Sequence, residues 1–184
     1  MTKVCIALLA AGCLFAQTRA GHAPPQFYRI DDRIYRGDQP RDSDFAGFAE
    51  MGIKTVLDLR GGIFHAPRER KLAEAAGLQY VSIQLSGLFA PTDQQVAKIL
   101  AVLEDPNRSP LFVHCKRGGD RVGLVIACYR MAHDHWSNSK ALEEARNLGL
   151  SRWEPLMRRY IRRFDAARLP RDTSPALSPQ KLPN

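Results

Sequence analysis

Hydrophobic and polar positions alternate along this chain in blocks that predict strands and helices in turn. Apolar runs of strand length lie at residues 53–59, at 79–85 and just before Cys115, and an early strand pair or hairpin is predicted over 27–35. Between these runs, apolar positions recur at helical spacing. The predicted helices cover residues 42–51, 67–76, 92–103, a segment that begins at Arg121, 139–147 and 153–167. This order is typical of a single α/β domain with a mostly parallel central sheet flanked by helices.

The N-terminal stretch does not fit this pattern. Residues 1–20 combine a positive start at Lys3 with an apolar run too short to span a bilayer and small residues near position 20. These features are typical of a secretory signal peptide, so we expect an exported protein, periplasmic or secreted. Cys13 follows a glycine and small residues, which leaves open a lipoprotein anchored at Cys13.

The rest of the chain is expected to form one domain over residues 21–169, followed by a disordered, proline-rich tail over 170–184. Beyond the leader, Cys115 and Cys128 are the only cysteines, which excludes a disulfide framework. Cys128 lies about two turns into a helix and is expected in the core. No transmembrane segment and no nucleic-acid module is present in the mature sequence, and a monomer is expected.

The charge balance favours anionic substrates. The chain carries a formal net charge of +8, and a basic surface attracts anions. Part of this excess lies in the last predicted helix, which is rich in arginine. Its apolar positions predict an amphipathic helix that packs on the domain through Trp153, Leu156, Tyr160 and Phe164.

One segment carries the candidate chemistry, because it places a cysteine and an arginine around two glycines between a strand and a helix. A loop that enters a helix N-terminus aims several backbone N–H groups at one anion, and the helix dipole favours negative charge there. Glycines let the backbone approach a ligand closely, and the arginine fork matches two phosphate oxygens. The segment reads His114, Cys115, Lys116, Arg117, Gly118, Gly119, Asp120 and Arg121.

The same donors act on the sulfur of Cys115. A free thiol has a pKa of about 8.5, and a helix N-terminus with nearby cations stabilises the thiolate. We therefore expect Cys115 to be an exposed nucleophile that forms a phosphocysteine intermediate, which water then hydrolyses. Lys116 and Arg117 would make the rim basic, or would simply point into water. His114 would orient the loop, or would be an ordinary hydrogen-bonded histidine at a strand end.

Residues 114–123 resemble the His-Cys-(five residues)-Arg signature of the protein tyrosine and dual-specificity phosphatase superfamily. The Lys-x-Gly-x-Asp-Arg version looks most like atypical dual-specificity phosphatases of bacterial type. Supporting pieces flank it at residues 34–40, 57–60 and 129–136, so the resemblance spans most of 27–164. It implies a phosphatase-like fold and a hydrolase that needs no cofactor and no metal. The implied substrate is a phosphorylated protein, an inositol phosphate or a phosphoinositide.

This sequence departs from the family pattern at two places. Val122 stands where a hydroxyl residue usually follows the arginine, which predicts slower hydrolysis of the intermediate. Residues 81–91, where the family often carries its general acid, hold no Asp or Glu. Asp120 inside the loop is one substitute acid, and Asp93 is another. Asp93 also follows a capping-box threonine, so it could simply favour the helix dipole.

Two other functions remain open from the residues. A pseudophosphatase would bind phosphate groups in the same loop without turnover, which the missing upstream acid and Val122 favour. A rhodanese-like sulfurtransferase also places a cysteine in an anion-binding loop. The intact Cys115 and Arg121 argue against a pseudophosphatase, and the spacing of Arg121 from Cys115 favours phosphate over a sulfurtransferase reaction.

Overall fold

The computed structural model describes residues 26–60, 62 and 65–170. The predicted signal peptide, Cys13 and nearly all of the predicted tail therefore lie outside the described residues. In the order of the chain, the elements are β1 (Phe27–Arg29), β2 (Ile34–Gly37), α1 (Asp44–Glu50), β3 (Thr55–Asp58), α2 (Ala66–Ala75), β4 (Gln79–Ser82), α3 (Asp93–Glu104), η1 (Pro106–Arg108), β5 (Leu111–His114), α4 (Asp120–Ala132), α5 (Asn138–Asn147), α6 (Pro155–Arg163) and η2 (Ala166–Arg168).

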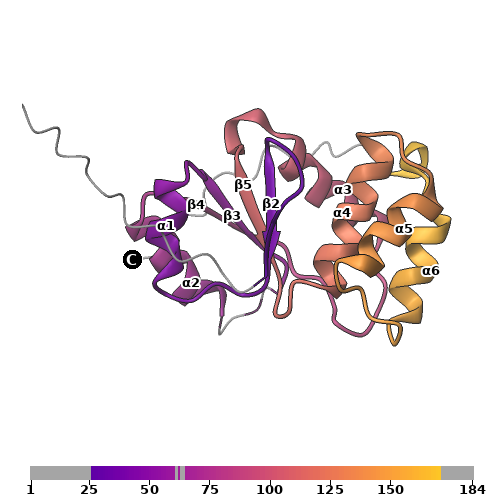
Figure 1. Ribbon diagram of the computed structural model, residues 1–184, viewed down its shortest axis with the longest axis horizontal. Helices are drawn as coiled ribbons and strands as arrows, with labels where there is room; N and C mark the ends of the chain where they lie inside the picture. Colours follow the sequence, from indigo (N-terminus) through magenta and orange to yellow (C-terminus); the bar gives the residue numbers. More distant parts are fainter. Residues whose placement is uncertain (1–25, 61, 63–64, 171–184) are drawn as a thin grey trace, which may run out of the picture.

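Within the described residues the strands form one sheet in the order β1-β2-β5-β3-β4. β1 and β2 form the predicted antiparallel hairpin, and all other pairings are parallel. Every residue of β3 and β5 is buried, as expected for parallel strands covered on both faces. Figure 1 shows α1 and α2 on one side of the sheet and α3 to α6 on the other. The predicted α/β architecture with a mostly parallel sheet is confirmed.

Each face of the sheet has its own core. The face under α1 and α2 is aromatic: Phe112 of β5 packs on Phe48 of α1 and on Phe27 of β1. The opposite face is aliphatic and larger, and it contains Cys115 and Cys128 among the buried side chains of β3, β5, α3, α4, α5 and α6. Cys128 is fully buried, as predicted, and burial raises the pKa of its thiol.

Local signals in the sequence set most of the helix ends. Thr92 and Gln95 form the predicted capping box at the start of α3, with reciprocal side-chain to backbone hydrogen bonds. Gly77 closes α2 in the left-handed conformation (φ 77°), which glycine adopts without steric cost. No helix in the described ranges is long and apolar enough to cross a bilayer.

The last helix differs from the prediction. Pro155 begins α6, so Trp153 precedes the helix and is 76% exposed. Met157 and Ile161 are buried instead, and Phe164 is buried as predicted. Tyr160 is only partly buried, and the predicted face was therefore wrong for Trp153 and for Leu156, which is 43% exposed. The helix ends at Arg163, and the Asn138 side chain donates hydrogen bonds to the carbonyls of Ile161 and Phe164 there.

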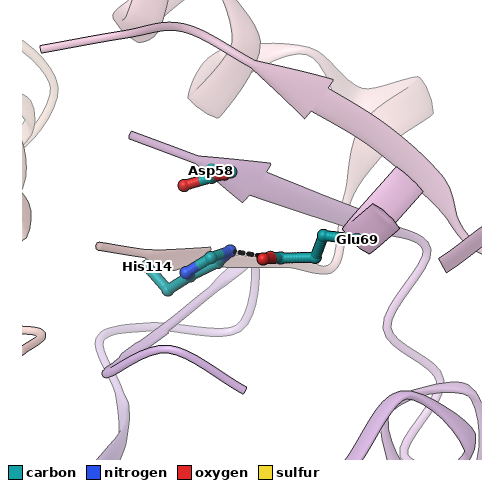
Figure 2. Close-up of side chains that lie close together, drawn as sticks. All are labelled: Asp58, Glu69 and His114. Atoms are coloured by element: carbon teal, nitrogen blue, oxygen red, sulfur yellow. Dashed lines mark ion pairs between the residues drawn. The ribbon is translucent and has the colours of Figure 1, made fainter. Parts of the chain in front are cut away.

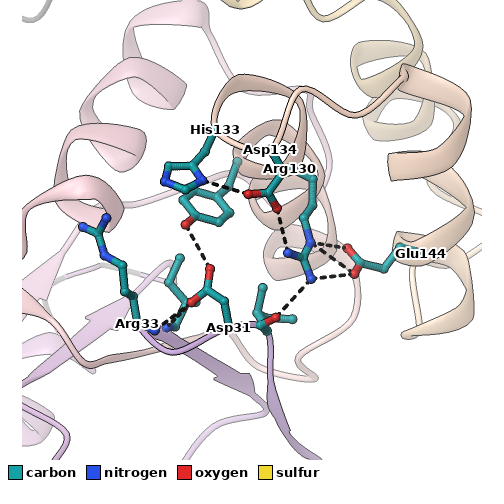
Figure 3. Close-up of polar contacts among 9 residues, drawn as sticks. Asp31, Arg33, Arg130, His133, Asp134 and Glu144 are labelled. Carbon is teal, nitrogen blue, oxygen red and sulfur yellow. Dashed lines mark hydrogen bonds and ion pairs between the residues drawn. The ribbon is translucent and has the colours of Figure 1, made fainter.

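A polar network fixes α4, the helix that follows the cysteine loop (Figure 3). Asp31, in the turn of the hairpin, accepts a hydrogen bond from the Tyr129 hydroxyl at 2.9 Å. Arg130 pairs with Asp134 at 2.7 Å and with Glu144 of α5 at 3.0 Å. These contacts tie the β1–β2 hairpin, the last turn of α4 and α5 together.

Candidate active site

The cysteine loop runs from the carboxyl end of β5 to the first turn of α4. It borders a cavity of about 310 Å³ that opens beyond the strand ends, where ligands bind in open α/β sheets. The cavity is lined by Gly87, Cys115, Lys116, Arg117, Asp120, Arg121 and Glu154. The structure thus brings together five of the predicted site residues around one hollow.

Cys115 lies at the floor of this cavity. It is 2% exposed and packs in the aliphatic core, so the expectation of an exposed cysteine was wrong. The loop folds over it, and Lys116 and Arg117 at the rim take the exposed positions instead. A buried sulfur in contact with a cavity is shielded from solvent and can be reached only through the mouth of the site.

The two glycines sit where no side chain fits. Gly118 adopts a left-handed conformation (φ 65°), and a Cβ built on it would lie 2.7 Å from the carbonyl carbon of Gly37 and 2.8 Å from the amide nitrogen of Asp38. A Cβ on Gly119 would lie 2.3 Å from the carbonyl oxygen of Gly149. The loop is therefore pressed between the end of β2 and the connection from α5 to α6. Alternating right- and left-handed backbone of this kind forms an anion-binding nest.

The predicted acids occupy different surroundings. Both oxygens of Asp120 are engaged: Oδ1 accepts a hydrogen bond from the amide of Ser151 at 2.9 Å, and Oδ2 lies 3.2 Å from Nη2 of Arg117. These contacts hold the Asp120 carboxylate between the loop and the connection from α5 to α6. Asp93 does not line the cavity. It accepts a hydrogen bond at 2.7 Å from the hydroxyl of Tyr160.

Glu154 is a carboxylate of the cavity that the sequence did not single out. It lies just before α6 and is partly buried. In the described part of the chain, no hydrogen bond or ion pair of its side chain is found, in contrast to Asp120. Only its place directly before Pro155, at a helix start, could have drawn attention to it, and that position has no relation to Cys115 in the sequence.

Behind the nest, His114 belongs to a buried polar cluster (Figure 2). Its Nε2 lies 2.6 Å from Oε1 of Glu69, which is close enough for an ion pair, although the angle does not suit a hydrogen bond. Its Nδ1 lies 3.4 Å from the carbonyl oxygen of Cys115. Asp58, Glu69 and His114 bring their ligand atoms within 4.8 Å of one another, as a metal site would. However, the Arg60 guanidinium binds both carboxylates. A cation of the protein thus already fills the place of a metal.

Arg60 also sets the charge of the cluster. Burial by itself would raise the pKa of Asp58, but the hydrogen bond from Arg60 and the charges of His114 and Arg60 outweigh it, and the pKa of Asp58 is lowered. Tyr80 donates its hydroxyl to the same carboxylate at 2.9 Å, and burial raises the pKa of this phenol. The cluster therefore holds His114, and with it the start of the loop, in a fixed orientation.

A second, more open hollow adjoins the first. It has a volume of about 590 Å³ and shares Gly87 and Arg121 with the cysteine cavity. Its other lining residues come from the stretch after β4 and from α3, with Arg60 at one side. Leu88 borders it and is 76% exposed. Arg121 stands between the two hollows, so a ligand longer than one phosphate group could contact both.

Comparison with known proteins assigns the chain to a family. Residues 24–159 match the model described as "DSP-PTPase phosphatase fused to NAD+ Kinase". The chain belongs to the dual-specificity phosphatases. This phosphatase is 31% identical over 155 residues to the inositol diphosphatase DSP5 of Arabidopsis thaliana, over 79% of this chain and 72% of the relative.

Two solved structures share its fold. The catalytic core of the PP-IP phosphatase SIW14 from S. cerevisiae, in complex with citrate, matches with a TM-score of 0.70 and 24% identity over 80% of this chain and 90% of that one. TpbA of P. aeruginosa matches with a TM-score of 0.67 and 26% identity, over 78% and 87% of the two chains. The expected phosphatase fold and hydrolase class are confirmed.

Proposed function

We propose that this phosphatase removes a phosphate group from a compact, multiply charged phosphate ester or anhydride, with an inositol diphosphate as the best candidate. The observation that carries the proposal is the single cavity that joins Cys115, Arg121 and the basic rim of Lys116 and Arg117. The relative named an inositol diphosphatase supports this substrate class. Phosphoproteins and phosphoinositides are the competing substrates that the experiment below separates.

In the proposed reaction, the Cys115 thiolate attacks phosphorus in line with the bond that breaks. The S–P bond forms as the P–O bond to the leaving group breaks, and the leaving oxygen takes the electron pair. Arg121 and the loop amides stabilise the charge of the transferring group. Water then attacks the phosphocysteine, the S–P bond breaks, inorganic phosphate leaves and the thiolate is restored.

The lack of a carboxylate at the usual general-acid position fits an anhydride better than a simple ester. The stretch 81–91 holds no carboxylate, and both oxygens of Asp120 are engaged by the Ser151 amide and by Arg117. A general acid matters most when the leaving group is a strong base. A diphosphate releases a phosphate group, which carries its negative charge well without protonation, so it needs little help from an acid.

The second step is proposed to be slow. Val122 follows Arg121 directly and is fully buried, and it has no hydroxyl to donate to the departing thiolate. Val122→Thr should speed breakdown of the phosphocysteine in single-turnover measurements. Unchanged breakdown in a folded Val122→Thr protein would contradict the assigned role.

The function is tested by measuring phosphate release by wild type and Cys115→Ser. The substrates are an inositol diphosphate, inositol hexakisphosphate, a phosphoinositide, a phosphotyrosine peptide and p-nitrophenyl phosphate. Cys128→Ser is the matched control, because this other cysteine of the domain lies in the core. We expect activity in wild type and Cys128→Ser, highest on the diphosphate, and none in Cys115→Ser. No phosphate release by wild type from any of these substrates would reduce the protein to a phosphate-binding module, and equal measurable rates in wild type and Cys115→Ser would refute Cys115 as the nucleophile. A tenfold preference for the peptide or the phosphoinositide would overturn the substrate class.

We also propose that the phosphatase is exported, on the strength of residues 1–20. Expression with the native N-terminus in a bacterial host, followed by fractionation and intact mass, tests this. Cleavage near residue 20 is expected. A mass that shows lipid on Cys13 would replace the soluble form with a lipoprotein, and an uncleaved chain in the cytoplasm would refute export.

A further inference from the structure

Arg36 is a buried arginine beside the cysteine loop that the proposed chemistry has not yet used. It lies on β2, in register with Val113 of the neighbouring β5, and is 1% exposed. Arginine is almost never fully buried unless it is paired. In the described ranges, Arg36 forms no ion pair with a carboxylate, and its Nε and Nη1 have no hydrogen-bond partner. Burial of this unpaired charge costs free energy, so we expect the position of Arg36 to serve a function.

The hydrogen bonds of Arg36 reach the nest from behind. Nη2 donates to the carbonyl oxygen of Gly118 at 2.6 Å and to that of Leu148 at 3.2 Å. In a trans peptide the carbonyl and the next amide point in opposite directions. Because Arg36 fixes the Gly118 carbonyl, the N–H of Gly119 is held pointing away from Arg36. The second bond anchors the connection that begins at Leu148, which also packs on Gly119 through Gly149.

The charge of Cys115 acts on the pKa of Arg36. Burial lowers the pKa of Arg36 to about 10, and among the influences that oppose this lowering, Cys115 is the largest. Arg36 is therefore a cation at neutral pH. Glu144 and Tyr28 act on it more weakly. The charged groups of the site itself are Lys116, Arg117, Asp120 and Arg121 from the loop and Glu154 before α6, with His114 and Glu69 behind it.

We infer that Arg36 is a positioning residue of this phosphatase: it orients the Gly118–Gly119 peptide for phosphate binding and places a buried positive charge behind the Cys115 thiolate. Two observations carry this inference. The bond to the Gly118 carbonyl sets the peptide plane, and the missing carboxylate partner leaves the charge available to the sulfur. The inference rests on the proposed function of Cys115 as nucleophile.

The test uses two variants and a readout that needs no turnover. Arg36→Gln removes the charge but keeps an amide donor, and Arg36→Lys keeps the charge but loses the fork. Alkylation of Cys115 by iodoacetamide is followed by mass spectrometry from pH 4 to 10, with vanadate binding as a second readout. We expect the pH midpoint of alkylation to rise by about one unit in Arg36→Gln, because loss of a nearby opposite charge disfavours the thiolate. It should stay near that of wild type in Arg36→Lys.

Vanadate should bind roughly tenfold more weakly to both variants, because neither holds the peptide as the guanidinium does. Arg130→Gln is the matched control: it removes another internal arginine, in the network of Figure 3, and should lower stability without moving the alkylation midpoint. The inference is overturned if Arg36→Gln, folded by circular dichroism, alkylates and binds vanadate like wild type, or if Arg36→Lys shifts the midpoint as Arg36→Gln does.

These outcomes can be told apart from a failure of the proposed function. If wild type shows no cysteine-dependent phosphate release but its alkylation midpoint still depends on the charge at Arg36, the nest exists and the reaction assigned to it is wrong. If wild type is active and Arg36→Gln matches it in both readouts, the reaction stands and Arg36 is only part of the core.

Discussion

Replacement of Gly118 by alanine should damage both the fold and the chemistry, for reasons that two measurements separate. A left-handed φ costs a non-glycine residue about 1–2 kcal/mol. At Gly118 the new methyl group would also lie 2.7 Å from the Gly37 carbonyl carbon and 2.8 Å from the Asp38 nitrogen. Both are backbone atoms that cannot rotate away, and overpacking of this kind adds about 1–3 kcal/mol. Gly118→Ala should therefore destabilise the protein by about 2–5 kcal/mol.

Gly77→Ala is the matched control. Gly77 has a similar left-handed φ of 77°, but a Cβ there would meet nothing within 4 Å. Its cost should be the backbone strain alone, about 1–2 kcal/mol, with activity unchanged because Gly77 ends α2, away from the cavity. The difference between the two variants isolates the close approach of the loop to β2.

Urea unfolding measures the stability of each variant, and p-nitrophenyl phosphate hydrolysis at low temperature measures the activity of the folded fraction. In Gly118→Ala the loop must shift by several tenths of an ångström to relieve the contacts. Because a misplacement of about 1 Å can cost 10²-fold in rate, we expect at least a tenfold loss of kcat/KM. Equal stability in the two variants, together with full activity in Gly118→Ala, would refute the argument that the loop is pressed against β2.

Three further predictions follow from other parts of the molecule. Asp120 and Glu154 are the candidate general acids, and the variants Asp120→Asn and Glu154→Gln test them. The variant that lacks the true acid should hydrolyse an alkyl phosphate about 10²-fold more slowly or worse, with little effect on p-nitrophenyl phosphate. If neither variant shows this difference, neither residue is the acid. Asp58→Asn should cost about 3 kcal/mol at pH 7 in urea unfolding. Because the folded pKa of Asp58 lies below its unfolded value, this difference from wild type should shrink as pH falls below about 4, and a constant difference would count against the charged pair. Ile161→Ala should cost about 2–4 kcal/mol and Leu156→Ala under about 1 kcal/mol, since only the first side chain is buried; similar costs would contradict the buried face of α6.

Much of the fold followed from the sequence because local signals and hydrophobic pattern agreed. The apolar runs placed β3 and β5 between helices, and the capping box at Thr92 placed the start of α3. The loop from Cys115 to Arg121 was visible because all its parts are adjacent in the chain. Such a motif carries its own geometry: a strand end, two glycines and a helix start are enough to predict an anion site.

The residues that sequence reasoning missed come from distant segments. Arg36 follows Tyr35 on a short strand, where an arginine would ordinarily face water, and only the register of β2 with β5 brings it under the loop. Glu69 and Glu154 reach the site from α2 and from the start of α6. Met157 and Ile161 were missed because the pattern was counted from Trp153, whereas the helix begins only at Pro155.

The positions of these distant residues indicate which part of the site binds the phosphate group and which part selects the substrate. The floor of the cavity is fixed before any ligand arrives, because β2 and the α5–α6 connection hold the nest on both sides. Amides and charges that need not reorganise stabilise any transferring phosphoryl group equally well. The floor therefore cannot distinguish one phosphate compound from another. Discrimination must come from the rim, where exposed Lys116 and Arg117 face Glu154 and the open hollow beside Leu88. Lys116 and Arg117 belong to the signature, but Glu154 and the hollow beside Leu88 come from segments outside it. The signature therefore identifies the reaction, and these added segments select the substrate.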